Sequence, residues 1–220
     1  MNQHTTPPHA RTRGEGLDGA GCELGGGPDR WGLRVVIHAA LDEAGGIGLR
    51  GGLPWRLPSD LARLRAATLG RVVVLGRSTC EGMGRLLEDR ASVVLSRGGG
   101  MGKGGDLSKG GVFVPPAPRK PSTPAAVVVQ DWDGAWEAAA RAGMGERVCV
   151  LGGAVVYAGA LAWAREVCAA RVPGVWGCDT FCPGLMPDAL EAAGFALVEM
   201  EGESAPWGGL VRYERWVRGR

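Results

Sequence analysis

The sequence predicts an α/β fold: a single domain with a central, mostly parallel mixed β-sheet flanked by helices and a C-terminal antiparallel hairpin. Three observations lead to this fold class. Short apolar runs rich in Val and Leu recur along the chain, helical stretches lie between them, and two strand-like segments follow each other near the end. Uninterrupted apolar runs are typical of strands covered on both faces, as in a parallel sheet.

The expected elements follow one another in regular alternation before the hairpin. Strands are predicted at 33–41, 72–76, 92–96, 125–130 and 147–153, and helices at 58–69, 77–84, 132–142 and 154–162. The first helix opens with Pro58, which suits the first helical position, and carries Asp60 in its first turn, where an acid interacts favourably with the helix dipole. The hairpin is expected from 195–201 and 210–217, which are joined by a loop containing Gly and Pro.

Two stretches are expected to be irregular, and the domain is placed at 32–220. Residues 1–31 are rich in Gly, Pro, Thr and charge, lack a periodic apolar pattern, and are interpreted as a disordered N-terminal extension. Residues 97–124 are rich in Gly, Pro and Lys and form a longer connection than compact domains usually need, so they are interpreted as a flexible insertion. Strand–helix alternation resumes after them.

The composition argues against several classes of protein. The 220-residue chain has 45% apolar and 22% charged residues, and its formal net charge of +2 gives no electrostatic footprint for nucleic acid or anionic lipid. No apolar run approaches the roughly 20 residues that span a bilayer. A monomeric cytoplasmic protein is expected. Organelle targeting stays open, because Arg11 and Arg13 in the extension are accompanied by Glu15, Asp18 and Glu23.

Cysteine and histidine usage narrows the chemistry. The six cysteines include one close pair, Cys178 and Cys182, with no second pair and no histidine nearby, so no metal site is predicted and reduced packing thiols are expected. His38 is the only histidine within the domain, lies in an apolar strand, and is assigned no role. Histidine triads and bases are therefore nearly excluded, and a carboxylate, tyrosine, lysine or cofactor must carry any catalysis.

The densest signal is residues 46–68, GIGLRGGLPWRLPSDLARLRAAT, which combine a glycine-rich loop, a Pro-Trp corner and a helix. Asp60, Leu64 and Thr68 share one helix face because they are spaced four residues apart. Apolar neighbours leave the Asp60 carboxylate poorly solvated, which raises its pKa. A lone carboxylate beside an apolar slot suits a substrate with paired N–H donors; the alternative is a carboxylate that only offsets the helix dipole.

The order of motifs along the chain resembles dihydrofolate reductase. The resemblance runs through GIG…LPWRLPSDL…T, VVVLGRST, VVLSR, VCVLGGAVVY and DTFCP, and it spans the predicted domain in the family's order. It implies the family's fold and NADPH-dependent reduction of 7,8-dihydrofolate to 5,6,7,8-tetrahydrofolate by hydride transfer, in support of one-carbon metabolism and thymidylate synthesis. The implied ligands are dihydrofolate and antifolates such as methotrexate.

The resemblance also assigns roles at the chemical centre. Asp60 matches the carboxylate that accepts two hydrogen bonds from the pterin amidine edge, Trp55 a tryptophan backing the pterin pocket, and Thr180 a position after the late strands; these three are the catalytic candidates. Arg90 matches the arginine that clamps the α-carboxylate of the glutamate tail, although an exposed turn arginine is the alternative. The implied substrate-binding residues are Ala40, Asp60, Leu61, Leu64, Met83, Leu87, Arg90, Leu151 and Tyr157.

The implied cofactor is NADPH rather than NADH, because Arg77, Ser78 and Arg97 could neutralise a ribose 2′-phosphate. Gly152–Gly153 matches a cis peptide bond of the family, although an ordinary tight turn also fits a Gly-Gly pair. Residues 45–52 match a mobile lid over the nicotinamide. The implied cofactor-binding residues are Ala40, Ile47, Gly48, Gly76, Arg77, Ser78, Thr79, Leu95, Ser96, Arg97, Gly152, Gly153, Ala154, Val155, Val156 and Tyr157.

One departure from the family pattern and two other functions stay open. The family's threonine beside the catalytic carboxylate falls at Ala170, so either a hydrogen bond is absent or the irregular segment 171–177 shifts the alignment. The reductase of riboflavin biosynthesis has a similar fold and uses NADPH, but it would not be expected to carry the LPW–LPxD helix. A non-catalytic relative that binds NADPH or pterin is the other alternative.

Overall fold

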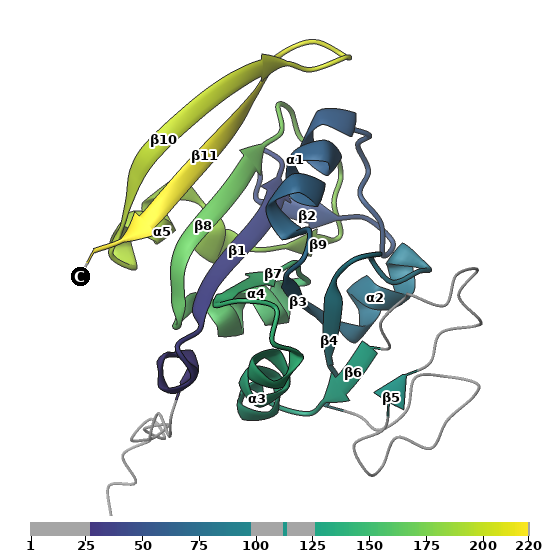
Figure 1. Cartoon of the computed structure of the whole chain (residues 1–220). Helices are drawn as coiled ribbons and strands as arrows, with labels where there is room; N and C mark the ends of the chain where they lie inside the picture. Colours follow the sequence, from purple (N-terminus) through teal and green to yellow (C-terminus); the bar gives the residue numbers. More distant parts are fainter. Residues whose placement is uncertain (1–26, 98–111, 114–125, 220) are drawn as a thin grey trace, which may run out of the picture.

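Strands from both ends of the chain meet in one nine-stranded sheet, shown in Figure 1. The computed structural model describes residues 27–97, 112–113 and 126–219. The strands are β1 Arg34–Leu41, β2 Gly46–Gly48, β3 Val72–Gly76, β4 Ala91–Leu95, β5 Val112–Phe113, β6 Ala126–Val129, β7 Arg147–Val150, β8 Ala164–Arg171, β9 Thr180–Phe181, β10 Phe195–Ser204 and β11 Leu210–Arg218. The helices are α1 Pro58–Thr68, α2 Arg77–Met83, α3 Trp132–Ala142, α4 Ala154–Leu161 and α5 Pro187–Ala192, with 3-10 helices η1 Pro28–Trp31 and η2 Pro183–Leu185.

The sheet is mostly parallel. Its order is β10-β11-β8-β1-β7-β3-β4-β6-β5, and the strands from β8 to β6 in that order are parallel to one another. The hairpin of β10 and β11 adds to β8 in antiparallel orientation at one edge, and β5 pairs antiparallel with β6 at the other. The predicted α/β class, with its mixed sheet and terminal hairpin, is therefore confirmed.

Helices cover both faces of the sheet. α3, α4 and α5 pack on one face, where Trp136, Tyr157 and Leu190 join the largest hydrophobic core. α1 and α2 lie on the other face, shown toward the viewer in Figure 1. Successive side chains of a strand point to opposite faces, so Ile37 of β1 enters the large core while Ala40 faces the α1 side.

The strand β8 is the main element that the sequence analysis did not predict. Charged residues interrupt its apolar run, AREVCAAR, and conceal the strand pattern. Within the sheet two of these charges, Glu166 and Arg171, have partners on other strands. The Arg171 guanidinium lies 2.8 Å from a Glu214 carboxylate oxygen of β11, and Arg147 of β7 lies 2.9 Å from Glu166 of β8. Burial of β8 therefore depends on residues distant in the sequence.

Two parts of the predicted irregular stretches form regular elements. Residues 28–31, which the sequence predicts to be part of the disordered extension, form η1. The preceding Gly27 packs so tightly that a Cβ there would lie 2.9 Å from Nε1 of Trp163. Within the predicted insertion 97–124, residues 112–113 form β5. The remainder of both stretches, apart from Gly27 and Arg97, lies outside the described residues.

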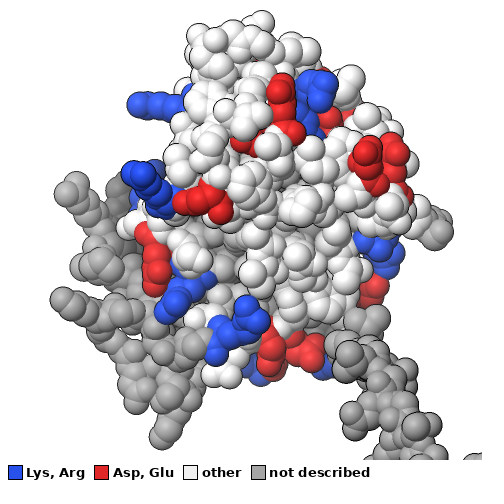
Figure 2. Space-filling model, turned by 180° about the vertical axis from the view of Figure 1, so that it is seen from behind, with Lys and Arg blue, Asp and Glu red and all other residues white. Residues whose placement is uncertain are grey.

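Charges of both signs are interspersed on the molecular surface. Figure 2 shows acidic and basic side chains next to one another on the face seen from behind, separated by wide uncharged areas. Exposed ion pairs of this kind include Arg165–Asp29 and Arg141–Glu137, at 2.8 and 2.7 Å. None of the described helices combines the length and apolarity required to cross a membrane.

Candidate active site

A cavity of about 1410 Å³ opens at the carboxyl ends of β1, β3, β4 and β7. Its wall combines the end of β1, the lid segment (45–52), α1, the start of α2, the residues after β4, and the Gly152–Gly153 edge with the first turn of α4. Open α/β sheets bind ligands in the crevice outside the carboxyl ends of their strands. The cavity is therefore the candidate active site.

α1 carries an acidic side chain, Asp60, into this cavity. Leu57 has extended backbone and Pro58 is the first helical residue, so Asp60 lies in the first turn. Burial raises the pKa of Asp60 to about 6, against the opposing effect of the Arg63 guanidinium. The predicted upward shift is thus confirmed. Among the described residues, none donates a hydrogen bond to the Asp60 carboxylate, which leaves both oxygens available to a ligand.

Two aromatic side chains define the inner wall near Asp60. Trp55 is buried and packs edge-on against Trp176, with ring centroids 6.1 Å apart. The Tyr157 hydroxyl donates a 2.7 Å hydrogen bond to the backbone carbonyl of His38, which ties α4 to β1. Burial raises the pKa of Tyr157 further above neutrality, so the hydroxyl remains a donor. The Trp176 contact and the His38 hydrogen bond thus fix the two rings, and both rings line the cavity.

Two aspartates hold the lid segment against the loop that follows β8. Asp42 accepts hydrogen bonds from the N–H at the start of β2 (2.7 Å) and from Trp176 N (3.0 Å). Asp179 accepts one from Arg50 N at 2.7 Å, and this bond is the main reason that the pKa of Asp179 lies below its usual range. In addition, β2 pairs with β9. The lid, expected as a loop, is therefore partly a strand that is fixed to the loop after β8.

The lid also makes a close contact with α2 at Gly82. A Cβ at this position would overlap the carbonyl oxygen of Gly51, so a side chain at residue 82 requires the lid to move. We expect Gly82→Ala to loosen the lid and to accelerate amide hydrogen exchange at Arg50 by roughly tenfold. Gly52→Ala is the matched control, because its Cβ would meet no atom closer than 3.9 Å, and its effect should be smaller. Equal exchange in both variants would contradict this assignment.

A strip of glycines and small polar residues forms the opposite side of the cavity. Gly76 N donates a 2.7 Å hydrogen bond to the Gly152 carbonyl, which joins the ends of β3 and β7. The Gly152–Gly153 peptide bond is cis, as predicted. Ser78 and Thr79 of α2 and Ser96 and Arg97 after β4 line the same strip. Hydroxyl and guanidinium groups are thus placed beside glycine backbone that lines the cavity, an arrangement suited to phosphate groups.

The structure gathers nearly all of the predicted site residues in this single cavity. Its wall includes Ala40, Ile47, Gly48, Trp55, Asp60, Leu61, Leu64, Gly76, Arg77, Ser78, Thr79, Met83, Leu87, Leu95, Ser96, Arg97, Leu151, Gly152, Gly153, Ala154, Val155, Val156, Tyr157 and Thr180. Thr180 reaches the cavity from β9, and its hydroxyl donates to the Asp179 carboxylate at 2.9 Å. That bond connects Thr180 to the lid contacts rather than to Asp60.

Arg90 is the predicted site residue that the cavity wall does not include. Its side chain is buried, and its guanidinium donates to Thr68 Oγ1 at 2.8 Å and to the Glu88 carbonyl at 2.9 Å. A further bond of 3.3 Å reaches the Arg65 carbonyl at the end of α1. The alternative of an exposed turn arginine is wrong, because these bonds anchor Arg90 between α1 and the segment before β4.

Sequence reasoning missed several residues of the wall. His38 and Cys168 line the cavity from β1 and β8, and Arg63 and Tyr213 line it from α1 and β11. Burial lowers the pKa of His38 to about 4, so it is neutral at physiological pH. Register between strands brings these residues together, and that register is not visible in the sequence. Ala170, the departure from the family pattern, lies opposite Ala40 in the same wall.

Comparison with known proteins links this chain to one family. The family model for dihydrofolate reductase matches residues 34–106. Dihydrofolate reductase type A13 of Escherichia coli is 31% identical over 169 residues, which cover 77% of this chain and 86% of that protein. Dihydrofolate reductase type 3 of Salmonella typhimurium is 49% identical over 65 residues, 30% of this chain and 40% of that protein.

Two further relatives define the extent of the similarity. Dihydrofolate reductase of Haemophilus influenzae is 49% identical over 63 residues, 29% of this chain, so the chain matches about two fifths of the length of this relative and of the Salmonella protein. The solved structure of dihydrofolate reductase from Enterococcus faecalis complexed with NADP(H) and RAB-propyl has a TM-score of 0.65 at 23% identity, covering 86% of this chain and 98% of that one. At this identity the structural likeness supports the fold.

Proposed function

Because the chain belongs to the dihydrofolate reductase family, we propose that it reduces 7,8-dihydrofolate to 5,6,7,8-tetrahydrofolate with NADPH as the hydride donor. The observation that carries the proposal is Asp60. Its partly buried carboxylate faces the cavity, has an elevated pKa and has no hydrogen-bond donor among the described residues. A pterin presents two parallel N–H donors on its amidine edge, and these complement a carboxylate with two available oxygens.

In the proposed mechanism the protein orients the substrate and promotes its protonation. Bound NADPH supplies the hydride. Asp60 accepts two hydrogen bonds from the pterin, which fixes the ring and favours protonation of the ring nitrogen beside the reacting carbon. Trp55 and Leu64 supply apolar wall, and the lid, which lines the same cavity, excludes water from the reacting faces when it covers the bound ligands. Asp60 thus acts by orientation and charge.

The glycine strip has the properties that a dinucleotide requires. A Cβ on Gly76 would lie 3.1 Å from Val156 Cγ2, and one on Gly153 would lie 3.4 Å from Thr79 Oγ1, so side chains at these positions would crowd the strip. The first turn of α4 begins at Gly153 without a side-chain cap, which leaves N–H groups for a phosphate. These features support NADPH binding along the strip.

Arg77 is proposed to recognise the ribose 2′-phosphate that distinguishes NADPH from NADH. Its side chain is 47% exposed and lines the cavity beside Ser78 and Thr79. We expect Arg77→Ala to raise the Kd for NADPH roughly 10- to 100-fold, the range for a lost hydrogen bond to a charged group, and to change the Kd for NADH about twofold at most. Fluorescence titration measures both constants.

The matched control for this prediction is Arg85→Ala. Arg85 is an exposed arginine just after α2 and is absent from the cavity wall, so its removal should alter neither cofactor's Kd by more than about twofold. An equal loss of affinity for NADPH and NADH in Arg77→Ala would remove the 2′-phosphate assignment.

The substrate's tail, the oligomeric state and the cellular location belong to the same proposal. We propose that dihydrofolate and antifolates occupy the α1 side of the cavity, where Arg90, which lies outside the cavity wall, supports the end of α1 through Thr68 and the Arg65 carbonyl. The protein is proposed to act as a cytoplasmic monomer without nucleic-acid or membrane partners. The five cysteines of the described residues are free thiols, which suits a reducing compartment.

One assay tests the proposed function against its alternatives. The absorbance of NADPH is followed in the presence of dihydrofolate, with and without methotrexate, and we expect turnover that methotrexate abolishes. Tight methotrexate binding without turnover would instead indicate a non-catalytic relative. Oxidation of NADPH with a ribosylamino-pyrimidinone, and none with dihydrofolate, would indicate the riboflavin-pathway reaction.

A further inference from the structure

Two rows of side chains cross the sheet beneath α1, from the end of β1 to the edge strand β10. Residues paired in neighbouring strands point to the same face of a sheet, so the register defines each row. The first row is Ala40, Ala170, Tyr213 and Glu201, and the second is His38, Cys168, Arg215 and Glu199. All eight residues line the cavity that contains Asp60. The cavity therefore has a lateral arm that reaches the edge of the sheet.

The lateral arm exists because the middle of each row is small. Ala170 and Cys168 of β8 fill little of the space between α1 and the sheet. Above them α1 presents Arg63, whose guanidinium lies 4.1 Å from the centre of the Tyr213 ring and 2.8 Å from a Glu201 oxygen. The Arg63 and Glu201 side chains are 48% and 52% exposed, so they stand at the outer mouth of the arm.

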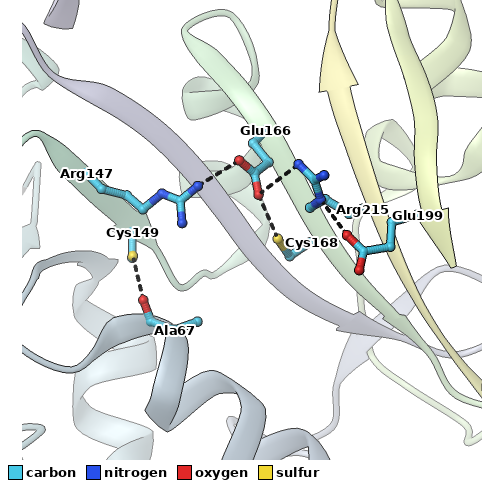
Figure 3. Close-up of polar contacts among 7 residues, drawn as sticks. All are labelled: Ala67, Arg147, Cys149, Glu166, Cys168, Glu199 and Arg215. Carbon is cyan, nitrogen blue, oxygen red and sulfur yellow. Dashed lines mark hydrogen bonds and ion pairs between the residues drawn. The ribbon is translucent and has the colours of Figure 1, made fainter. Parts of the chain in front are cut away.

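Polar groups continue along the arm from its mouth inward. Figure 3 shows Arg215 between Glu199, at 2.9 Å, and Glu166, at 4.0 Å, with the Cys168 thiol directed at Glu166. Glu166 itself lies outside the cavity wall, whereas Arg215, Glu199 and Cys168 belong to it. Nearer to Asp60, the Tyr213 hydroxyl lies 3.0 Å from Ser59 Oγ, in the first turn of α1. The remaining donors and acceptors of these charged and hydroxyl groups are suited to holding water molecules in the arm.

We propose that the lateral arm is a water-filled route by which the Asp60 carboxylate exchanges protons with bulk solvent while the lid is closed. The proposal rests on the proposed function, since reduction of dihydrofolate consumes one proton per hydride. That proton enters from hydronium at the mouth, which becomes water, and is passed along the waters of the arm to the carboxylate and the ring nitrogen beside it. Arg63, Tyr213 and Tyr157 interact electrostatically with Asp60. The other titratable groups of the two rows are His38, Cys168, Arg215, Glu199 and Glu201.

The test measures proton exchange directly and needs no turnover. A nitrogen-15-labelled 2,4-diaminopyrimidine is bound to the full chain, and exchange of its ring N–H proton with water is followed by NMR saturation transfer. Cys168→Phe fills the arm at its centre and Glu201→Phe fills its mouth. We expect each substitution to slow the exchange at least about tenfold while the diaminopyrimidine still binds.

Two controls separate blocking of the arm from other effects of these substitutions. Glu201→Ala removes the ion pair with Arg63 and leaves the mouth open, so exchange should remain fast. Glu203→Phe adds the same bulk two residues along β10, on the same face and outside the cavity wall, and should also leave exchange fast.

Each outcome of this experiment decides the proposal. Unchanged exchange in Glu201→Phe, with diaminopyrimidine affinity retained, would overturn the proposal. It would indicate that the proton enters past the lid instead. Glu201→Phe lies at an exposed position and decides the matter even if Cys168→Phe does not fold. Slowed exchange in a protein that fails to oxidise NADPH with dihydrofolate would uphold the route and reject the proposed function.

Discussion

Asp60→Asn is expected to lower the rate of hydride transfer at pH 7 by roughly 100- to 1000-fold, within the range for a positioned acid–base group. An asparagine keeps the shape but offers one acceptor and two donors where the pterin needs two acceptors, and it removes the negative charge that favours ring protonation. Burial places the wild-type pKa near 6, so the pH profile of kcat/KM should inflect there in the wild type and lose this inflection in the variant. Stopped-flow single turnovers measure the rate.

The same substitution should stabilise the folded protein at neutral pH. The folded state holds the Asp60 proton more tightly than the unfolded chain, because burial raises the pKa from 3.8 to about 6. Stability therefore falls as the pH rises from about 4 to 6, and above that range the charged carboxylate destabilises the folded state. After allowance for partial exposure, Asp60→Asn should gain about 1–2 kcal/mol at pH 7 and nothing below pH 4. Urea unfolding at both pH values tests this.

Low pH provides the control for the catalytic half of this prediction. A substrate already protonated in solution needs less assistance from Asp60, so the defect of Asp60→Asn should shrink as the pH falls. Near-normal turnover of the variant at pH 7 would contradict the proposed mechanism. Unchanged stability at pH 7, with turnover lost, would mean that the charged carboxylate is better solvated than its position in the cavity wall indicates.

Glu214→Leu is expected to destabilise the fold by about 3–5 kcal/mol, because it leaves the buried Arg171 charge without its counterion. Both side chains are less than a tenth exposed. The carboxylate accepts from Arg171 Nε at 2.8 Å and from Trp216 Nε1 at 2.9 Å, and Arg171 also donates to the Leu185 carbonyl. These hydrogen bonds join β8 to β11. Chemical denaturation measures the decrease in the free energy of unfolding when Glu214 is replaced.

Two further variants distinguish burial of the charge from loss of packing. The double variant Arg171→Met, Glu214→Leu removes both charges and should recover most of the lost stability. Glu199→Leu breaks the Arg215–Glu199 pair on the same hairpin, whose members are 43% and 53% exposed, and should change stability by less than about 1 kcal/mol. If the double variant is as unstable as Glu214→Leu alone, packing rather than charge is the cause.

Much of the fold could be predicted because its signals are local. The apolar run 72–76 forms β3 with the predicted ends, and 132–142 forms α3, which Asp131 caps by accepting from Gly134 N at 2.8 Å. Pro58 and Asp60 mark the start of α1 from within its own first turn. Each of these features depends on neighbours in the sequence, so a single segment contains the information.

The parts that escaped prediction depend on partners far away in the chain. The charged residues of β8 interrupt the apolar pattern of a strand. In the fold, Arg147 of β7 and Glu214 of β11 neutralise Glu166 and Arg171 of β8. Residues 112–113 and 28–31 contain no pattern that indicates β5 or η1. From the sequence, Arg90 fits either a ligand-binding or a solvent-exposed arginine. Its burial depends on hydrogen bonds to Thr68 and to two backbone carbonyl groups, which only the tertiary structure supplies.

The sequence by itself determined the order of elements, the placement of Asp60 at the start of a helix and the glycines of the strip, because periodicity, helix-start residues and backbone freedom are properties of short segments. Tertiary structure decided the contacts that hold the lid, the burial of Arg90 and the lateral arm behind Asp60. The arm requires that Ala170 and Cys168 of β8 pair with Tyr213 and Arg215 of β11, which depends on the register between the two strands. Register is set by packing between strands that lie more than 40 residues apart, roughly the span from Cys168 to Arg215.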